Sequence, residues 1–203
     1  MPAHQVEQLK GWKVKWQVFN TAIAYTENGP YMQANNGKIF YMGSLGNEPI
    51  NRIIALNAVD GSLAIKTDPI ETNMEFLVDD SALYIGKFIS EIAKYDLVTQ
   101  KQVWTQTLGN SHAPCCFSVV NHQLQSNWYS SRFYIQSIED GEIIREMKDT
   151  QKRIYRIENG ITYSGGSGFL TAQNADQSVL WETELKAFSQ PPVFTKDAIY
   201  VRA

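Results

Sequence analysis

The residues best suited to chemistry in this chain are two adjacent cysteines and three histidines. Cys115 and Cys116 stand side by side, so they close no useful loop and cannot supply the four ligands of a zinc site by themselves. His4, His112 and His122 show none of the short spacings that metal-binding histidines have. We therefore expect no metal site and no disulfide framework.

Carboxylates could perform glycoside hydrolysis, but that reaction requires two of them on either side of the scissile bond. Glu75 is the one carboxylate within an apolar run that we expect to be an inner strand. Four other carboxylates fall near expected hairpin turns, where turn formation explains them: Asp60, Asp96, Asp140 and Asp176. Because no catalytic constellation is complete, we expect the protein not to be an enzyme.

Composition excludes several further classes of function. The 203 residues carry 18 Lys and Arg against 21 Asp and Glu, a balance that argues against nucleic-acid binding. With 43% hydrophobic residues the chain can bury a large core. No apolar run approaches the roughly 18 residues of a membrane span, and residues 1–10 lack the order of a signal peptide, so we expect a cytoplasmic protein without membrane contact.

The apolar pattern has a period of two and comes in short pieces. Runs such as 12–19, 38–42 and 102–108 are rich in aromatic and β-branched residues, which favours strands. Turn dipeptides of the hairpin kind separate such runs: Asn36-Gly37, Asp60-Gly61, Asp79-Asp80, Asp140-Gly141, Asn159-Gly160 and Lys196-Asp197. No stretch shows a convincing helical face, so the sequence predicts an all-β fold.

The strand pattern repeats about every 40 residues, with four strands in each unit. The third strand is the most regular element, as in Ile54-Ala-Leu-Asn-Ala-Val-Asp-Gly61. Four residues after that turn, the outer strand carries Ile65, Trp104, Arg145 or Trp181. One such sheet leaves both faces uncovered and must stack on neighbours, so the repeat indicates the four-stranded antiparallel blades of a β-propeller.

The third-strand repeat resembles that of the PQQ-type propellers, the quinoprotein alcohol dehydrogenase-like superfamily. Their repeat places an Ala-Leu-Asp-Ala stretch before a glycine turn and a tryptophan on the outer strand. Trp104 and Trp181 match that tryptophan, while Gln100 and Gln177 stand in place of the glycine. The resemblance implies a propeller with degenerate repeats, and a fold alone does not define a function.

The blade count depends on the two ends of the chain. Four complete units are expected over residues 31–67, 73–108, 113–147 and 152–185, and residues 191–201 supply the inner and second strands of a fifth. Residues 5–19, with a Lys10-Gly11 turn and Trp16, match a third and an outer strand. We expect these two halves to form one sheet, giving a five-bladed ring in a single domain of residues 1–203. A fragment of an eight-bladed parent shows the same repeats.

The resemblance also bears on Cys115 and Cys116, because quinoprotein alcohol dehydrogenases hold a vicinal disulfide against their cofactor. Those enzymes need a longer chain and a bound calcium. The segment 112–120 aligns equally well with the inner strand of the third unit, where small apolar residues pack. We expect no cofactor, and two buried thiols that react slowly.

A binding site is expected in the loops between second and third strands, which converge on one face of a propeller. Aromatic and charged residues in those loops form the candidate site: Glu48, Lys87, Phe88, Trp128, Tyr129 and Arg132. Aromatic and arginine side chains are typical anchors of protein interfaces. Trp128 packing over its own blade is the alternative.

Two functions agree with these features. The first is a monomeric, non-enzymatic propeller that binds a protein partner as a scaffold, an inhibitor or an immunity protein. The alternative is a small-ligand or carbohydrate-binding propeller, either a lectin or a degenerate glycosidase. The loops at 43–51, 86–90, 127–131 and 165–168 differ in length and character. That divergence favours one asymmetric partner over several equal ligand sites.

Overall fold

The computed structural model describes most of the chain beyond residue 20, and every regular element in that part is a β-strand. The described residues are 21–23, 25–26, 29–30, 32–45, 52–70, 75–80, 82–87, 90–108, 114–128, 132–148, 153–166, 168–185, 192–195 and 197–201. The all-β prediction is confirmed. No helix long and apolar enough to cross a membrane occurs among these residues.

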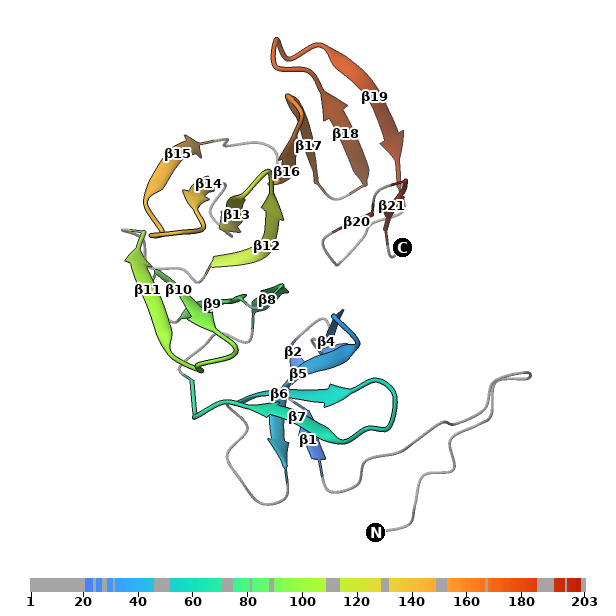
Figure 1. The fold of residues 1–203 in the computed structure, drawn as a ribbon. Helices are drawn as coiled ribbons and strands as arrows, with labels where there is room; N and C mark the ends of the chain where they lie inside the picture. The colour runs from blue at the N-terminus through green and yellow to red at the C-terminus, as the bar shows by residue number, and fades with distance from the viewer. Residues whose placement is uncertain are drawn as a thin grey trace, which may run out of the picture.

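Four antiparallel sheets, here called blades 1 to 4, follow one another along an arc, with their inner strands toward its centre (Figure 1). Blade 1 contains β4 (Met32–Asn35), β5 (Lys38–Leu45), β6 (Arg52–Asn57) and β7 (Leu63–Lys66). Blade 2 contains β8 (Phe76–Asp79), β9 (Ala82–Lys87), β10 (Glu91–Asp96) and β11 (Gln102–Thr107). Blade 3 contains β12 (Pro114–Val120), β13 (Gln123–Trp128), β14 (Arg132–Ser137) and β15 (Ile143–Lys148). Blade 4 contains β16 (Arg153–Glu158), β17 (Ile161–Gly166), β18 (Phe169–Gln173) and β19 (Val179–Glu184).

Each predicted unit of four strands is therefore present, and the fold is a β-propeller. A final hairpin of β20 (Val193–Phe194) and β21 (Ile199–Tyr200) stands where the inner and second strands of a fifth unit were predicted. The predicted closure of that unit by residues 5–19 lies outside the described residues, so the five-bladed ring stays a prediction.

Blade 1 has a feature that the sequence pattern missed. Its second strand, β5, pairs with β4 along residues 38–41 and with β1 (Thr21–Ile23) along residues 43–45. The inner strand of this blade thus consists of two pieces, β1 and β4. The short hairpin of β2 (Tyr25–Thr26) and β3 (Gly29–Pro30) lies between them in the chain.

The turns between inner and second strands explain the tight hairpins. Their residues have positive φ angles, as at Asn36 (46°), Gly37 (70°), Asn159 (50°) and Gly160 (77°). Asparagine, aspartate and glycine tolerate this conformation best, which is why the sequence places them there. The turn dipeptides were therefore a reliable guide to strand boundaries.

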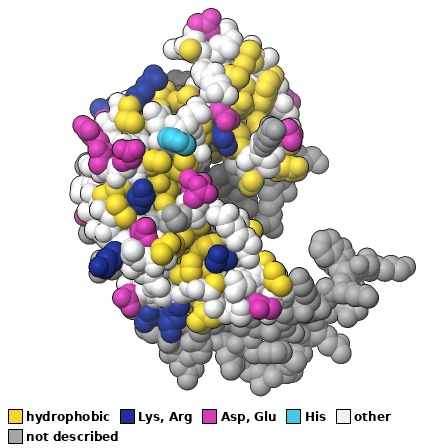
Figure 2. All heavy atoms as spheres, in the orientation of Figure 1, with side chains coloured by type: hydrophobic (Ala, Val, Ile, Leu, Met, Phe, Trp, Pro, Cys, Tyr) yellow, Lys and Arg dark blue, Asp and Glu magenta, His cyan; other side chains and the backbone are white. Residues whose placement is uncertain are grey.

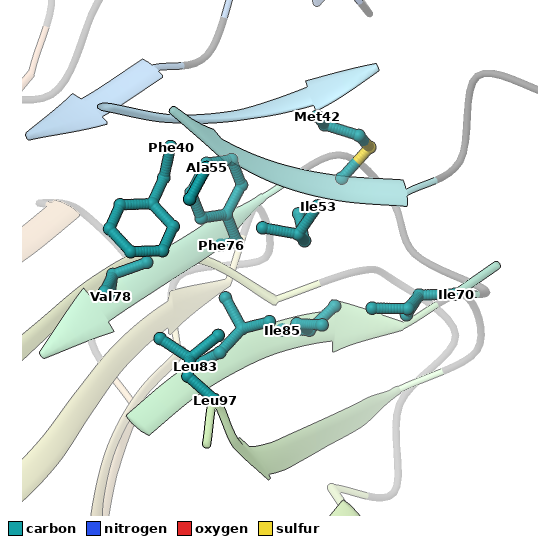
Figure 3. Close-up of a cluster of buried hydrophobic side chains, with 10 residues drawn as sticks. All are labelled: Phe40, Met42, Ile53, Ala55, Ile70, Phe76, Val78, Leu83, Ile85 and Leu97. Atoms are coloured by element: carbon teal, nitrogen blue, oxygen red, sulfur yellow. The ribbon is translucent and has the colours of Figure 1, made fainter. Parts of the chain in front are cut away.

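The core lies between the sheets. The cluster between blades 1 and 2 joins Phe40 and Ile53 of blade 1 to Phe76, Leu83 and Ile85 of blade 2, and these side chains point toward one another (Figure 3). All five are almost fully buried. Burying a side chain of this size contributes about 1.5–3 kcal/mol, so stacking of the blades supplies much of the stability.

The outer-strand tryptophan of blade 2 docks against blade 3. Trp104 is only 8% exposed, and its Nε1 donates a hydrogen bond to the Ile138 carbonyl at 3.2 Å. The ring lies on Gly141, where an added Cβ would come within 2.7 Å of it. Gly141 also has a φ of 79°, so this turn requires glycine for two independent reasons.

Amide side chains on inner strand β4 and second strand β13 join neighbouring blades as well. Gln125 of blade 3 donates to the Ile157 carbonyl at 2.6 Å and accepts from the Ile157 amide at 2.9 Å. Gln33 of blade 1 makes the same kind of paired contact with the Phe76 carbonyl (2.8 Å) and the Val78 amide (2.7 Å). Each amide therefore mimics one residue of an adjacent strand and satisfies backbone groups that would otherwise be buried without partners.

Candidate functional site

The candidate site belongs to the end of the blades where second strands connect to third strands, here called the loop end. Lys87 is the last residue of β9 and Arg132 the first residue of β14. The two cations thus lie at corresponding ends of adjacent blades. The backbone of Trp128 pairs directly with Arg132 in the β13–β14 ladder.

Three of these placements correct the sequence analysis. Trp128 and Arg132 were expected in the loop, but both belong to strands, because the hairpin keeps its pairing to the last residue on each side. Lys87 likewise ends a strand, opposite Glu91. Glu48, Phe88 and Tyr129 lie outside the described residues, as does the Trp128 side chain, so the structure does not test whether the six residues gather.

Arg132 is held by its own blade. Its Nη1 donates to Glu146 Oε1 at 2.9 Å, and both side chains are about one-third exposed. The Tyr134 hydroxyl lies within hydrogen-bond distance of the same carboxylate oxygen (3.2 Å). The pKa of Arg132 is raised, mainly by its hydrogen bond with Tyr134 and also by the charge of Glu146. This guanidinium therefore presents a fixed positive charge.

Lys87 has an analogous but uncharged support. Its Nζ donates to Gln102 Oε1 at 3.0 Å, and the Tyr95 hydroxyl donates to the same oxygen at 3.2 Å. In both blades, an acceptor on the outer strand fixes a cation at the loop end. The sequence places Gln102 and Glu146 on the expected outer strands of their units. Which cation each of them contacts depends on the register between strands, which the sequence pattern does not give.

Cys116 departs from its predicted environment. It lies on inner strand β12 as expected, at an irregularity in the β12–β13 register, and its φ is 59°. The Cys116 thiol is half-buried rather than buried. Arg153 Nη2 donates to its sulfur at 2.8 Å. The side chain of Cys115 lies outside the described residues.

The opposite end of the blades is rich in aspartates, and they cap turns as predicted. Asp96 accepts from the Val98 and Thr99 amides at 2.8 and 2.7 Å, and Asp60 and Asp176 accept from Ser62 and Ser178. These bonds lower the pKa of Asp96, chiefly through the Thr99 amide. The pKa values of Asp140 and Asp176 are lowered in the same way, by Glu142 and by Ser178.

The other residues considered for chemistry, the histidines and Glu75, join no metal-binding group among the described residues. His122 is exposed in the β12–β13 turn. Asp79 has a raised pKa, mainly from burial and then from repulsion by Asp80, while His122 opposes the shift. Within the described residues, no group of three or more His, Cys, Asp or Glu could hold a metal ion. Glu75 is half-buried just before β8, outside the strand in which it was expected.

A groove between blade 4 and the terminal hairpin was not anticipated from the sequence. It has a volume of about 500 Å³, and its walls include Tyr163, Trp181 and Phe194. The Tyr163 ring lies edge-on to Phe194, with centroids 5.2 Å apart, and at 6.3 Å from Trp181. Trp181 occupies the docking position of its repeat yet is 38% exposed. The repeat position of Trp181 was the one sequence signal that could have pointed to this groove.

Comparison with known proteins identifies the fold alone. No family model matches the chain, and no curated protein matches its sequence. Among solved structures, BamB from Moraxella catarrhalis superposes with a TM-score of 0.60 at 14% identity, over 95% of this chain and 60% of that one. A chain of the Mitotic Checkpoint Complex gives a TM-score of 0.60 at 15% identity, over 85% and 59%. The computationally designed Ika8 protein gives 0.54 at 12%, over 76% and 45%.

These matches confirm the β-propeller fold, built from repeated blades. This chain spans at most 60% of the length of those three structures. The PQQ-type family itself is not established by them.

Proposed function

We propose that the protein is a non-enzymatic propeller that binds one protein partner through its loop end, in the cytoplasm, as a scaffold or an inhibitor of the immunity type. The observation that carries the proposal is the pair of supported cations at the loop end, Lys87 on Gln102 and Arg132 on Glu146. Side chains that are already fixed lose little conformational entropy on binding.

The body beneath these cations is joined by a shared core. Blades 2 and 3 share a buried cluster that includes Tyr84, Trp104 and Tyr134. An interface built on such a platform needs no rearrangement of the backbone, which suits a dedicated partner. Trp128, paired beside Arg132, and Phe88 and Tyr129 next in the chain are the aromatic anchors in this proposal.

The proposal also includes membership of the PQQ-type propellers. Trp104 of one blade packs on the turn glycine Gly141 of the next. This contact supports the resemblance, because it joins the two most distinctive positions of that repeat. It does not depend on the quinone cofactor, for which we propose no role.

Charge reversal at the loop end, compared with charge reversal at the opposite end, tests the site. We expect Lys87→Glu and Arg132→Glu to weaken capture of a stoichiometric protein from the native cell by at least about tenfold, through lost charge complementarity. Lys101→Glu is the matched control, since Lys101 is exposed beside the turn at the opposite end. Equal capture by all three variants, or capture of a glycan in place of a protein, contradicts the proposal.

Trp128→Ala tests the aromatic part of the site separately. Loss of a central interface anchor costs about 2 kcal/mol or more of binding free energy, so capture should fall while the melting temperature stays unchanged. A lower melting temperature with unchanged capture means that Trp128 packs on its own blade, and the anchors must then be sought elsewhere.

A further inference from the structure

The groove between blade 4 and the terminal hairpin is lined by aromatic rings from both of these elements. Tyr163 and Trp181 come from β17 and β19 of blade 4, and Phe194 comes from β20. Trp181 is 38% exposed, whereas Trp104 is 8% exposed. Figure 2 shows hydrophobic side chains gathered over this blade. The groove therefore leaves open aromatic surface of a kind that the interface between blades 2 and 3 buries.

The three rings are inclined to one another. The planes of Tyr163 and Phe194 meet at 65° with centroids 5.2 Å apart, and those of Tyr163 and Trp181 meet at 50° with centroids 6.3 Å apart. A flat stacking surface suits a planar ligand such as a sugar ring or a nucleobase. Inclined rings offer several π-surfaces to a rounded group, so their arrangement favours a compact ligand over a flat one.

The charged residues of the groove are acidic. Glu158 and Asp197 belong to its walls, and none of the described residues that line it is Lys or Arg. Arg156 lies next to the groove, where its Nη2 donates to Glu158 Oε1 at 3.1 Å. Its guanidinium is 5.3 Å from the centroid of the Phe194 ring, so this ring already attracts one cation. Because Arg156 and Glu158 neutralise each other, Asp197 leaves the groove with a negative charge.

We propose that this groove binds a small molecule with a trimethylammonium group, of the choline class. The inference goes beyond the proposed partner binding and uses none of the loop-end residues. A quaternary ammonium spreads its charge over methyl groups and has no N–H, so aromatic faces and a nearby carboxylate hold it without fixed hydrogen bonds. The volume of about 500 Å³ falls within the range of small-molecule sites.

Two side chains contribute most to the proposed binding. Trp181 is the main ring, because indole binds cations more strongly than the rings of tyrosine and phenylalanine do. Asp197 is exposed at the tip of the terminal hairpin and supplies the complementary charge. The inference therefore assigns a binding role to a tryptophan whose counterpart, Trp104, docks one blade on the next.

Calorimetric titration of the full-length chain tests the ligand class. Choline is compared with 3,3-dimethylbutan-1-ol, which has the same shape but carries carbon in place of the charged nitrogen. We expect choline to bind at least about tenfold more tightly, because only the cation is attracted by the rings and the carboxylate. Equal affinities, or no binding of choline, overturn the proposal. A trimethyl-lysine peptide that binds more tightly than choline overturns the assignment to a small molecule.

Fluorine NMR of the chain labelled with fluorotryptophan locates the binding. The Trp181 signal is identified by its disappearance in Trp181→Phe. Choline should shift this signal and leave the Trp104 signal in place. A shift at other tryptophans without one at Trp181 means that choline binds elsewhere, which overturns the assignment to the groove.

Substitutions in the groove separate the two contributions. Trp181→Leu should weaken choline binding at least about fivefold, and Trp181→Phe should restore part of the affinity. Asp197→Asn should weaken it about threefold, since exposed charges interact weakly, and this exposed position keeps the test open if the leucine variant does not fold.

Tyr200→Leu is the matched control, because Tyr200 is a 61% exposed aromatic residue of the same hairpin that does not line the groove. Its affinity for choline should stay unchanged. Unchanged affinity in the Trp181 and Asp197 variants as well, or an equal loss in Tyr200→Leu, overturns the proposal.

Discussion

Trp104 and Trp181 occupy the same position in two repeats, yet one belongs to the core and the other to the surface. Each packs on an aromatic residue of its own blade in nearly the same way. The ring centroids of Trp104 and Tyr84 are 6.2 Å apart, with 47° between the ring planes. Those of Trp181 and Tyr163 are 6.3 Å apart, with 50° between the planes. The geometry within the blade is thus conserved across repeats, and the neighbouring sheet alone decides burial.

This difference shows how a repeat fold distributes stability. The local sequence pattern of a blade specifies its own strands and turns. Its apolar faces contribute to stability only when the next blade packs on them and buries them. The same residue type at the same repeat position can therefore be buried between two blades and exposed where no blade covers it.

Replacing the two tryptophans should separate them most clearly. We expect Trp104→Ala to lower the free energy of unfolding by about 3–5 kcal/mol, through the cavity and the lost bond to Ile138. Trp181→Ala should cost less, because Trp181 is 38% exposed and Trp104 only 8%. Chemical denaturation measures both, and equal costs mean that the Trp181 face is also covered.

The next largest effect should come from the turn glycine under Trp104. Gly141→Ala should cost about 2–3 kcal/mol, because the new Cβ meets the ring at 2.7 Å and φ is positive. Gly160→Ala shares the positive φ but has nothing within 4 Å, so it should cost only about 1 kcal/mol. Similar unfolding midpoints for the two variants contradict the role given to the Trp104 contact.

The amide contact between blades 3 and 4 should matter somewhat less. Gln125→Leu leaves the Ile157 amide and carbonyl without their partner, which we expect to cost about 2 kcal/mol. Gln106→Leu is the control, since that side chain bonds only the adjacent Thr107 carbonyl. An unchanged unfolding midpoint for Gln125→Leu contradicts the interpretation of this contact as structural.

The smallest effect should be the pH dependence of the capped turns. Asp96, Asp140 and Asp176 have pKa values below their usual range when folded, so the unfolded chain binds protons more readily. Their contribution is complete above the ordinary aspartate pKa, and it is lost as pH falls through the lowered values. Denaturation near pH 6 and near pH 3 measures it. Asp140→Asn should show a slightly weaker acid dependence than the unaltered chain.

Much of the fold could be predicted because its signals are local. Turn pairs such as Asn36-Gly37 and Asn159-Gly160 mark hairpins through their positive φ, and strand alternation does the rest. The Trp104 docking position followed from repetition alone. The two-piece inner strand of blade 1 could not be predicted, because β1 is too short to show a pattern.

The candidate site was harder to predict because its contacts run between strands. The support of Arg132 by Glu146 depends on the register of β14 and β15, which includes a shift between Ile135 and Gln136. Cys116 lies at a register shift of the same kind. Neither shift has a marker in the residue types, so spacing alone could place these residues on strands but could not identify their partners.

The paired bonds of Gln125 and Gln33 to a neighbouring backbone have a consequence for how such rings change during evolution. Two sheets that touch only through apolar side chains can shift along each other with little loss of contact. An amide that both donates to and accepts from one strand of the next sheet fixes the position of the two sheets along the strand direction. Duplication or loss of a whole unit preserves that offset at every joint. Insertion of two residues within an inner strand displaces it, so length variation is confined to the connections between strands.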